Sequence, residues 1–476
     1  MSVKRIEADL IGSLSIPAGV LYGVHTRRAG FNFDVSGMRL KDFPELVQSM
    51  AMVKKAAALA NFDLGLLSEE RCRVICEACD DLIELREIDD NFPVDMMQGC
   101  AGTSTNMNVN EVVTNIALWK LGAIVGDYST LHPNDHVNLS QSTNDVYPTA
   151  LRLTILRACE GLVASQVELR DAFRAKAREY RTALKVGRTQ LQDAVPMTVG
   201  QEFEAFSELI DEDIGQVYSA CSLLKEVNLG GSAIGTSINV PAGFTNVACG
   251  HLSRISNLQL IPAKNLIEAT SDTGGFLSFS GVLKRIAVKL TKICNDLRLL
   301  SSGPRGGLGE IRLPPVQAGS SIMPGKVNPV IPEMINQIGF QVIGNDLTVT
   351  MAASAGELQL NAMKPIIVLN ILQSMRMLSR GMEIFKTRCV DGIEVDVDRC
   401  KALLVQSLVL ATPLATIVGY SKAAALSQKA LMENRALREI VEEDGTLTVG
   451  DIERVFDHAA GFADIALAPT TSSQGN

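Results

Sequence analysis

Eight apolar residues between positions 276 and 300 follow a spacing that alternates between three and four. They are Phe276, Phe279, Leu283, Ile286, Leu290, Ile293, Leu297 and Leu300. This spacing is typical of a helix whose single apolar stripe packs against other helices, as in a coiled coil. A second stripe with nearly the same rhythm runs through residues 203–224. The sequence therefore predicts long helices that pack side by side.

The rest of the chain fits a mainly α fold with three domains. Further apolar-rich helical stretches cover roughly residues 143–178, 329–352 and 361–388, and strand signals are few and short. We expect a mostly helical N-terminal domain over residues 1–140, a central bundle of long helices over 141–393 and a small helical domain over 394–476. The last domain ends in a polar tail. A chain of 476 residues is also too long for one compact core.

Composition argues against several classes of partner. The chain carries a net charge of −9, whereas proteins that bind nucleic acid or anionic lipid concentrate Lys and Arg. No stretch approaches the roughly 20 uninterrupted apolar residues of a membrane span. The N-terminus has no apolar run typical of a signal peptide. We expect a cytoplasmic protein that binds neither nucleic acid nor membrane.

Two groups of residues have spacings that raise the question of a metal site. Cys72, Cys76 and Cys79 fall near one helical face, but no fourth ligand lies nearby, and packing of small side chains is the favoured interpretation. His132 and His136 are four apart, but Pro133 interrupts them and no Glu lies between them as in zinc metalloproteases. The sequence predicts no metal and no cofactor.

Two polar loops in the first third of the chain are rich in short donors. The first, "GTSTNMNVNE", contains Thr103, Ser104 and Thr105. The second contains Ser142, Thr143 and Asn144 directly before a predicted helix, where the helix N-terminus can receive an anion. Helix caps and turns use the same residue types, so both interpretations stay open here.

Two more polar loops follow in the central region. In "VGRTQLQDAVPMT", Thr189 and Gln190 follow Arg188, for which a surface salt bridge is the alternative role. The other loop, "GSSIMPGKVNP", contains Ser320, Ser321, Met323, Lys326 and Asn328. The glycines at 303, 306, 307 and 309 precede it and suggest either a mobile segment or a long surface loop.

Together the four loops offer many neutral donors, one or two cations and almost no acids. This inventory suits a small dicarboxylate. Only five histidines exist in the chain, and neither of the last two loops contains one. A hydroxyl that acts as a base is therefore an open possibility.

The four loops, in this order, resemble the active-site segments of the aspartase/fumarase superfamily. The resemblance extends from about Arg5 to the region of Tyr420. It implies a mainly α, three-domain fold with a central helix bundle. It also implies a homotetramer in which three subunits contribute to each active site. The partners of the apolar stripe could then lie in other subunits.

The resemblance also implies a reaction and roles for residues. The family eliminates a group from a succinyl skeleton with anti geometry and releases fumarate through an enediolate. Ser320 would be the base, and Lys326 and Asn328 would bind the carboxylate that becomes the enediolate. The substrate-binding residues would be Thr103, Ser104, Thr105, Ser142, Thr143, Asn144, Thr189, Gln190, Ser321 and Met323.

Three positions bear on the leaving group. Fumarases of this family have segments that resemble "GTQTN", "SQSSND" and "GRTHLQDA". This chain has Ser104 in place of the Gln of the first segment, Thr143 in place of the third Ser of the second and Gln190 in place of the His of the third. These positions favour release of ammonia from L-aspartate. The alternatives are a fumarate hydratase, a lyase for another amine adduct of fumarate, and an inactive structural or binding homologue. Arg312 stands where aspartases usually have Asn, and it could alter loop closure or substrate choice.

Overall fold

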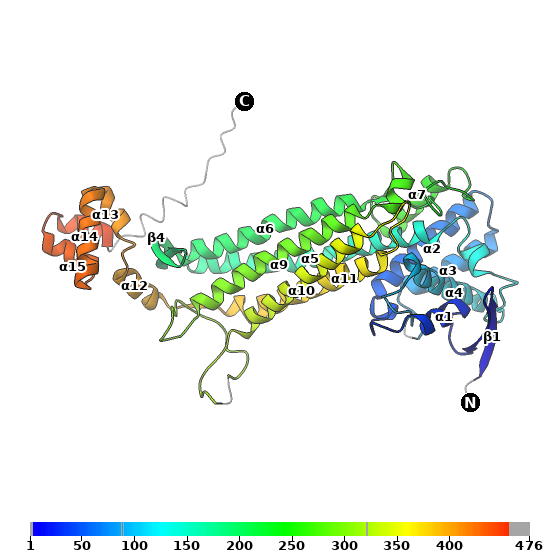
Figure 1. The fold of residues 1–476 in the computed structure, drawn as a ribbon, viewed down its shortest axis with the longest axis horizontal. Coiled ribbons are helices and arrows are strands. Elements are labelled where there is room, and N and C mark those ends of the chain that lie inside the picture. The colour runs from blue at the N-terminus through cyan, green and yellow to red at the C-terminus, as the bar shows by residue number, and fades with distance from the viewer. Residues whose placement is uncertain (1–2, 87, 89, 320–321, 457–476) are drawn as a thin grey trace, which may run out of the picture. The chain divides into compact units, whose positions relative to one another are not determined.

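The fold comes from a computed structural model that describes residues 3–86, 88, 90–319 and 322–456 (Figure 1). Most of these residues lie in helices, as the sequence predicts. The chain divides into two compact units. Unit 1 comprises Met1–Val163, Gly215–Ala287 and Phe340–Leu378, and unit 2 comprises Ala164–Ile214, Val288–Gly339 and Ser379–Asn476. These units do not test the predicted three-domain division, which stays a prediction.

The first part of the chain forms a hairpin and several short helices before the long helices begin. Its elements are β1 (Lys4–Asp9), β2 (Gly12–Pro17), α1 (Val24–Asn32), η1 (Leu40–Asp42), α2 (Pro44–Asp63), α3 (Glu69–Ile83), η2 (Cys100–Gly102), α4 (Thr103–Lys120) and the π-helix η3 (Pro133–Val137). Strands β1 and β2 pair antiparallel, and Lys4 lies opposite Pro17. Cys72 and Cys79 are buried and Cys76 is half-buried on α3, a helix that packs against α2.

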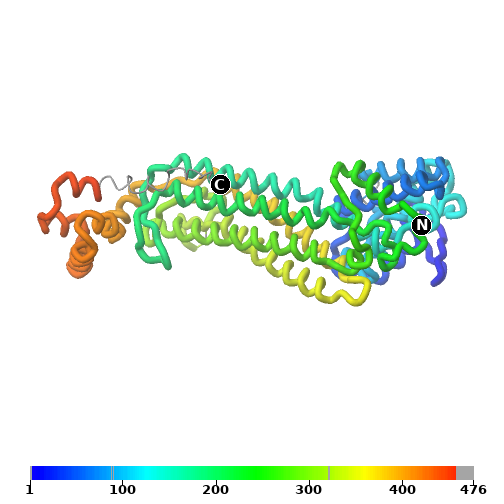
Figure 2. Tube along the Cα trace, turned by 90° about the horizontal axis from the view of Figure 1, so that it is seen from above, coloured from blue at the N-terminus to red at the C-terminus, as the bar shows by residue number. Residues whose placement is uncertain are grey.

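Five long helices dominate the remainder, and they run side by side in both ribbon views (Figures 1 and 2). They are α5 (Thr143–Glu179), α6 (Val199–Leu224), α9 (Gly274–Leu300), α10 (Val330–Ser354) and α11 (Lys364–Arg388). Between them lie β3 (Leu184–Thr189), β4 (Gln192–Thr198), β5 (Glu226–Val227), α7 (Phe244–Ser256), β6 (Ile261–Pro262), α8 (Leu266–Ser271) and β7 (Ile311–Arg312). These bounds agree with the predicted bundle.

The apolar stripe predicted on residues 276–300 is the buried face of α9. Its eight residues are each at most 5% exposed. Because this burial occurs within a single chain, the stripe does not need helices of other subunits, contrary to the possibility raised from the sequence. Side-chain pairs within each unit join neighbouring helices: Ser280 of α9 donates to Asp346 of α10 at 2.8 Å, in unit 1.

In unit 2, aromatic rings join three of the long helices. The ring centroid of Phe173 lies 5.7 to 6.2 Å from those of Phe203, Phe206 and Phe385, and all four rings are buried. The rings of Phe203 and Phe206 lie 6.2 Å from each other. Such edge-to-face and tilted pairs add to the free energy of burial. They fix α5, α6 and α11 to one another in this unit.

The C-terminal helices form a smaller cluster. They are α12 (Val397–Gln406), α13 (Ala411–Val418), α14 (Tyr420–Glu433), α15 (Leu437–Asp444) and α16 (Val449–Phe456), after η4 (Val390–Gly392) and β8 (Glu394–Val395). Their apolar residues pack together with Val186 of β3. Within the described residues, no single helix has the length and apolar character to cross a membrane, and only the bent pair α12–α13 meets that test jointly.

Candidate active site

The first two polar loops meet at the N-termini of two helices in unit 1. Thr103 begins α4 and Thr143 begins α5. The Thr103 hydroxyl donates to the Thr143 hydroxyl at 3.4 Å, and Asn106 Nδ2 donates to the same Thr143 oxygen at 3.1 Å. Helix N-termini favour anions because their first N–H groups lack partners within the helix. The structure thus brings together two segments that the sequence predicts to bind a carboxylate.

Three consecutive residues directly before α4 have an unusual backbone conformation. Cys100, Ala101 and Gly102 all have positive φ angles, of 59°, 54° and 95°. Two of the three carry a side chain, for which this conformation is costly, and such outliers concentrate at functional sites. At Gly102 a side chain is also excluded, because a Cβ would lie 2.5 Å from the ring of Tyr147. This backbone conformation and the contact of Gly102 with Tyr147 fix the position of Thr103 at the start of α4.

Ser104 and Thr105 differ in their surroundings. Ser104 is half-buried beside Thr103, whereas Thr105 is fully buried. Gln98 binds Thr105 twice, since its amide nitrogen donates to the Thr105 hydroxyl at 2.9 Å and its amide oxygen accepts from the Thr105 N–H at 3.0 Å. These two hydrogen bonds anchor the loop, and the substrate contact that the sequence predicts for Thr105 stays a prediction.

The buried carboxylate of Asp145 fixes the second loop. Asp145 Oδ1 accepts from the Ser142 N–H at 2.9 Å, and Asp145 Oδ2 accepts from the N–H groups of Gly230 and Ser232 at 3.0 Å each. Burial raises the pKa of Asp145 to about 6. Asn144 donates its amide to the carbonyl of Ala233 at 2.8 Å. The half-buried Ser142, Thr143 and Asn144 therefore sit on a fixed turn.

A buried lysine under this turn is a residue that the sequence reasoning missed. Lys54 Nζ donates to Asn138 Oδ1 at 2.8 Å and to Gln141 Oε1 at 2.9 Å, and burial lowers the Lys54 pKa to about 7. Asn106 and Asn110 also donate to Asn138 Oδ1. The available signal was a lysine within the apolar stretch "MVKKAAALA" of α2.

The histidines 132 and 136 are engaged in backbone contacts. His132 Nδ1 accepts from the N–H groups of Asn134 and Asp135 at 3.2 Å each, which caps η3. His136 Nδ1 accepts from the His132 N–H at 2.8 Å. A metal on these ring nitrogens would have to displace those hydrogen bonds.

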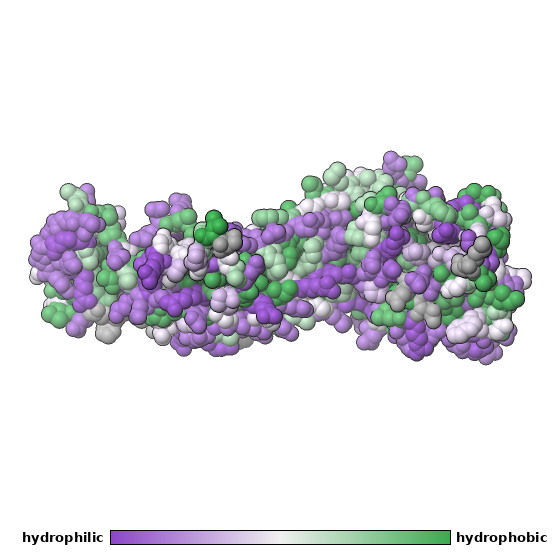
Figure 3. All heavy atoms as spheres, turned by 90° about the horizontal axis from the view of Figure 1, so that it is seen from below, coloured by the Kyte–Doolittle hydropathy of each residue, from purple (hydrophilic) through white to green (hydrophobic). Residues whose placement is uncertain are grey.

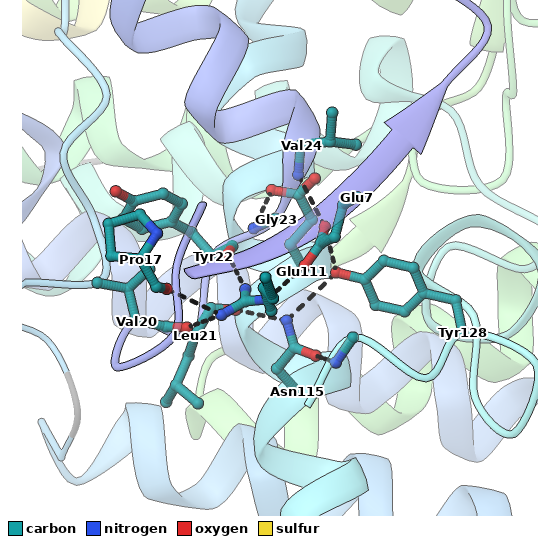
Figure 4. Close-up of polar contacts among 12 residues, drawn as sticks. Glu7, Pro17, Val20, Leu21, Tyr22, Gly23, Val24, Glu111, Asn115 and Tyr128 are labelled. Atoms are coloured by element: carbon teal, nitrogen blue, oxygen red, sulfur yellow. Dashed lines mark hydrogen bonds and ion pairs between the residues drawn. The ribbon is translucent and has the colours of Figure 1, made fainter. Parts of the chain in front are cut away.

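A buried carboxylate on α4 also fixes α1. Glu111 accepts from the N–H groups of Gly23 and His25 at 2.8 Å each. Its neighbour Glu7 accepts from the Val24 N–H and the Tyr128 hydroxyl, and Figure 4 shows Glu7 and Glu111 with Gly23, Val24 and Tyr128. Burial raises the pKa of Glu111 to about 7. A cavity of about 610 Å³ adjoins this network, and it is lined by none of the substrate-binding residues predicted from the sequence.

The third loop is the tip of the β3–β4 hairpin in unit 2. Thr189 and Gln190 are exposed there, and Gln190 and Leu191 have φ angles of 54° and 63°. Two consecutive positive φ angles are typical of a tight hairpin turn. Arg188 forms a salt bridge, but its partner is the fully buried Glu310 at 2.7 Å rather than a surface acid.

The fourth loop also belongs to unit 2. Met323 and Lys326 are exposed, Asn328 is half-buried, and the Lys326 N–H donates to the Met323 carbonyl at 3.2 Å. Gly319 approaches the Lys326 carbonyl so closely that a Cβ would overlap it. The predicted residues Ser320 and Ser321 lie outside the described residues.

The described parts of the four loops therefore form two groups. Thr103 and Thr143 are in contact in unit 1. Among the described residues of unit 2, no side-chain hydrogen bond or ion pair joins Thr189 or Gln190 to Lys326 or Asn328. Thr189, Gln190 and Lys326 are left exposed by the single chain.

Comparisons with known proteins identify relatives along nearly the whole chain. A family model described as "Lyase" matches residues 12–344, and one described as "Fumarase C C-terminus" matches residues 410–460. The chain is 53% identical to the aspartate ammonia-lyase of Pseudomonas aeruginosa, over 94% of this chain and 95% of that protein.

Two solved structures are similar over their whole lengths. A fumarate lyase:delta crystallin from Brucella melitensis, bound to cobalt, is 53% identical with a TM-score of 0.94, over 97% of this chain and 100% of that one. A class II fumarase from Schistosoma mansoni is 34% identical with a TM-score of 0.91, over 97% of this chain and 99% of that one.

Proposed function

The chain belongs to the lyase family whose model covers residues 12–344, and we propose on this premise that it converts L-aspartate reversibly to fumarate and ammonia. It would thus be a carbon–nitrogen lyase. The observation that carries the proposal is 53% identity to an aspartate ammonia-lyase over 94% of the chain. The contact between Thr103 and Thr143 at two helix N-termini supports it, because this arrangement suits a carboxylate.

The mechanism that we propose uses Ser320 as the base. Ser320, as its alkoxide, removes a proton from the carbon next to the side-chain carboxylate of aspartate and becomes a neutral hydroxyl. The electron pair moves into that carboxylate to give an enediolate. The enediolate then collapses to the double bond of fumarate as the carbon–nitrogen bond breaks and ammonia leaves.

Stabilising the doubly charged enediolate is the difficult step, and preorganised donors and a cation lower its free energy. Lys326 and Asn328 would bind this carboxylate. The other carboxylate and the amino group would be held by the donors at the two helix N-termini and the hairpin tip, with Ser321 and Met323 beside them. The donors are Thr103, Ser104, Ser142, Thr143, Asn144, Thr189 and Gln190.

We propose further that the protein is a homotetramer in which three subunits complete each site. The exposure of Thr189, Gln190 and Lys326 supports this, because a site for a small dicarboxylate has to enclose its ligand. Apolar side chains interrupt the polar surface on the face shown in Figure 3. On α10, Phe340, Ile343, Leu347 and Met351 are exposed at helical spacing, which suits a contact with another helix. A cytoplasmic location stays a prediction.

Fumarate hydration is the second candidate, because the Schistosoma fumarase is 34% identical. Gln190 argues against it, since an amide cannot exchange a proton near neutral pH as the His of fumarases can. An inactive homologue is disfavoured because Ser320, Lys326 and Asn328 are all present.

The test offers L-aspartate and L-malate separately to the purified protein and follows fumarate by its ultraviolet absorbance. We expect turnover of aspartate alone. Turnover of malate alone would instead assign hydratase chemistry. Absence of fumarate from both substrates would overturn the proposal.

A further inference from the structure

We propose that Glu310 is a positioning residue that fixes the hairpin of Thr189 and Gln190 to the segment leading into the loop of Lys326. The inference rests on the proposed lyase function, since it concerns two of its predicted substrate-binding loops. It requires no contact between Glu310 and the substrate.

Glu310 is held at both its side chain and its backbone. Its side chain is fully buried, with Oε1 2.7 Å from Arg188 Nη2 and Oε2 3.1 Å from Lys185 Nζ. Its N–H donates to the Leu300 carbonyl at 2.9 Å, and its own carbonyl accepts from the Asp396 N–H at 2.9 Å. These four contacts join Glu310 to strand β3, to the end of α9 and to the residue before α12.

The segment before Glu310 is attached as well. Arg399 donates to the carbonyls of Gly307 and Leu308 at 3.0 and 2.9 Å, and the Gly309 N–H donates to the Ser302 carbonyl at 2.9 Å. The glycine-rich stretch that suggested mobility is therefore tied down from Gly307 to Glu310. The next two residues are held as well, since Ile311 and Arg312 pair with Val395 and Glu394 of β8.

One carboxylate meets two cations of the same strand at an irregular part of the β3–β4 hairpin. In a regular strand, Lys185 and Arg188 would point to opposite faces, because side chains alternate. The β3–β4 pairing is irregular here, because the register shifts between Val186 and Arg188 and two residues of β4 lie opposite Gly187. Gly187 permits the bulge, since a Cβ there would lie 2.6 Å from the Val195 carbonyl.

The charges around Glu310 provide a matched control. Lys185 also pairs with Glu202 of α6 at 2.5 Å, so the loss of either glutamate leaves Lys185 with one carboxylate. Arg188 differs, because within the described part of the chain Glu310 is its only ion-pair partner. Its side chain is only 14% exposed, and an unpaired cation in that position is costly. Loss of Glu310 should release Arg188 toward water and displace Thr189 beside it.

The experiment compares Glu310→Gln with Glu202→Gln in the full-length protein, by steady-state kinetics on L-aspartate. We expect Glu310→Gln to lower kcat/KM by about 10-fold to 100-fold, the range that small displacements of substrate-positioning groups produce. Glu202→Gln should change it by less than about 3-fold, and Glu310→Asp should recover part of the loss. Arg188→Met should lower kcat/KM as well, and combining it with Glu310→Gln should add little. Equal losses in the two Gln variants, or additive losses in the double variant, would overturn the proposal.

Hydrogen exchange supplies a readout that does not depend on activity. Backbone amides of residues 186–195 and 306–312 should exchange faster in Glu310→Gln than in wild type, and those in Glu202→Gln should remain close to wild type. Unchanged exchange in Glu310→Gln would overturn the positioning role. If wild-type protein releases no fumarate, the proposed function fails, but the exchange result still decides the role of Glu310. If Glu310→Gln does not fold, Glu310→Asp takes its place in the same measurement.

Discussion

The hydroxyl of Thr103 donates to the hydroxyl of Thr143 at 3.4 Å, although 40 positions separate the two residues in the chain. Each residue begins a helix, so the contact places two helix N-termini next to each other. Both termini favour negative charge. A dicarboxylate that replaced this weak hydrogen bond would find donors from two helices at one point.

Thr143→Val should therefore weaken substrate binding. Valine keeps the volume of the side chain but removes the oxygen that accepts from Asn106 and can donate to substrate. We expect KM for L-aspartate to rise and kcat/KM to fall by about 10-fold, the effect of losing one hydrogen bond to a charged group. Steady-state kinetics measure this.

The matched control is Thr154→Val on the same helix. The Thr154 hydroxyl is buried and donates to the Ala150 carbonyl of α5. Its loss should lower the unfolding temperature and leave kcat/KM unchanged. Equal kinetic effects of the two variants would remove Thr143 from the substrate site.

Ser320→Ala should remove the proposed base. We expect kcat to fall by about 10²-fold to 10⁴-fold, the contribution typical of a general base. The oligomeric state, measured by sedimentation, should not change. A near-wild-type rate would take Ser320 out of the mechanism.

Lys326→Ala should damage both binding and turnover. Its ammonium group is proposed to act on a carboxylate that is charged in the bound substrate and more highly charged in the transition state. An interaction present in both states raises KM when it is removed, and the part specific to the transition state lowers kcat. An unchanged kcat/KM would contradict this role.

Lys364 makes stability depend on pH. It is buried, and it donates to the carbonyls of Thr270 and Asn361 at 2.8 and 3.1 Å. Burial lowers the pKa of Lys364 from 10.5 to about 8. Between pH 8 and 10.5 the unfolded chain therefore binds more protons at this residue than the folded protein does. Lys364 thus makes the folded state more stable as pH rises through this window.

Lys364→Met should remove this contribution. The free energy of unfolding of wild type relative to the variant should increase by at most about 1.4 kcal/mol per pH unit across the window. Thermal unfolding at pH 8 and pH 10 measures the trend. Lys386→Met, on the same helix but partly exposed, is the control. A difference between wild type and Lys364→Met that does not vary with pH would contradict the argument.

The sequence predicted the scaffold well because helical periodicity is a local signal. The stripe from Phe276 to Leu300 is buried along its whole length, and the predicted helices begin and end within a few residues of those observed. The polar loops were recognisable because short hydroxyl and amide side chains concentrate in them. Local patterns were sufficient for both.

The supporting residues could not be predicted in the same way. Lys54 meets Asn138 and Glu310 meets Arg188 across long stretches of chain, and no spacing in one sequence indicates such pairs. Thr105 looked like its neighbours but faces Gln98 in the interior, because successive helical residues point in different directions. Residue type suggested the chemistry, and the fold decided which side chains support it.

The most direct test of the account measures the products released from L-aspartate. Fumarate and ammonia should appear in equal amounts with wild-type protein, and Ser320→Ala should release both at a rate lower by about 10²-fold or more. Absence of both products with wild-type protein, or fumarate without ammonia, would contradict the assignment of an ammonia-lyase.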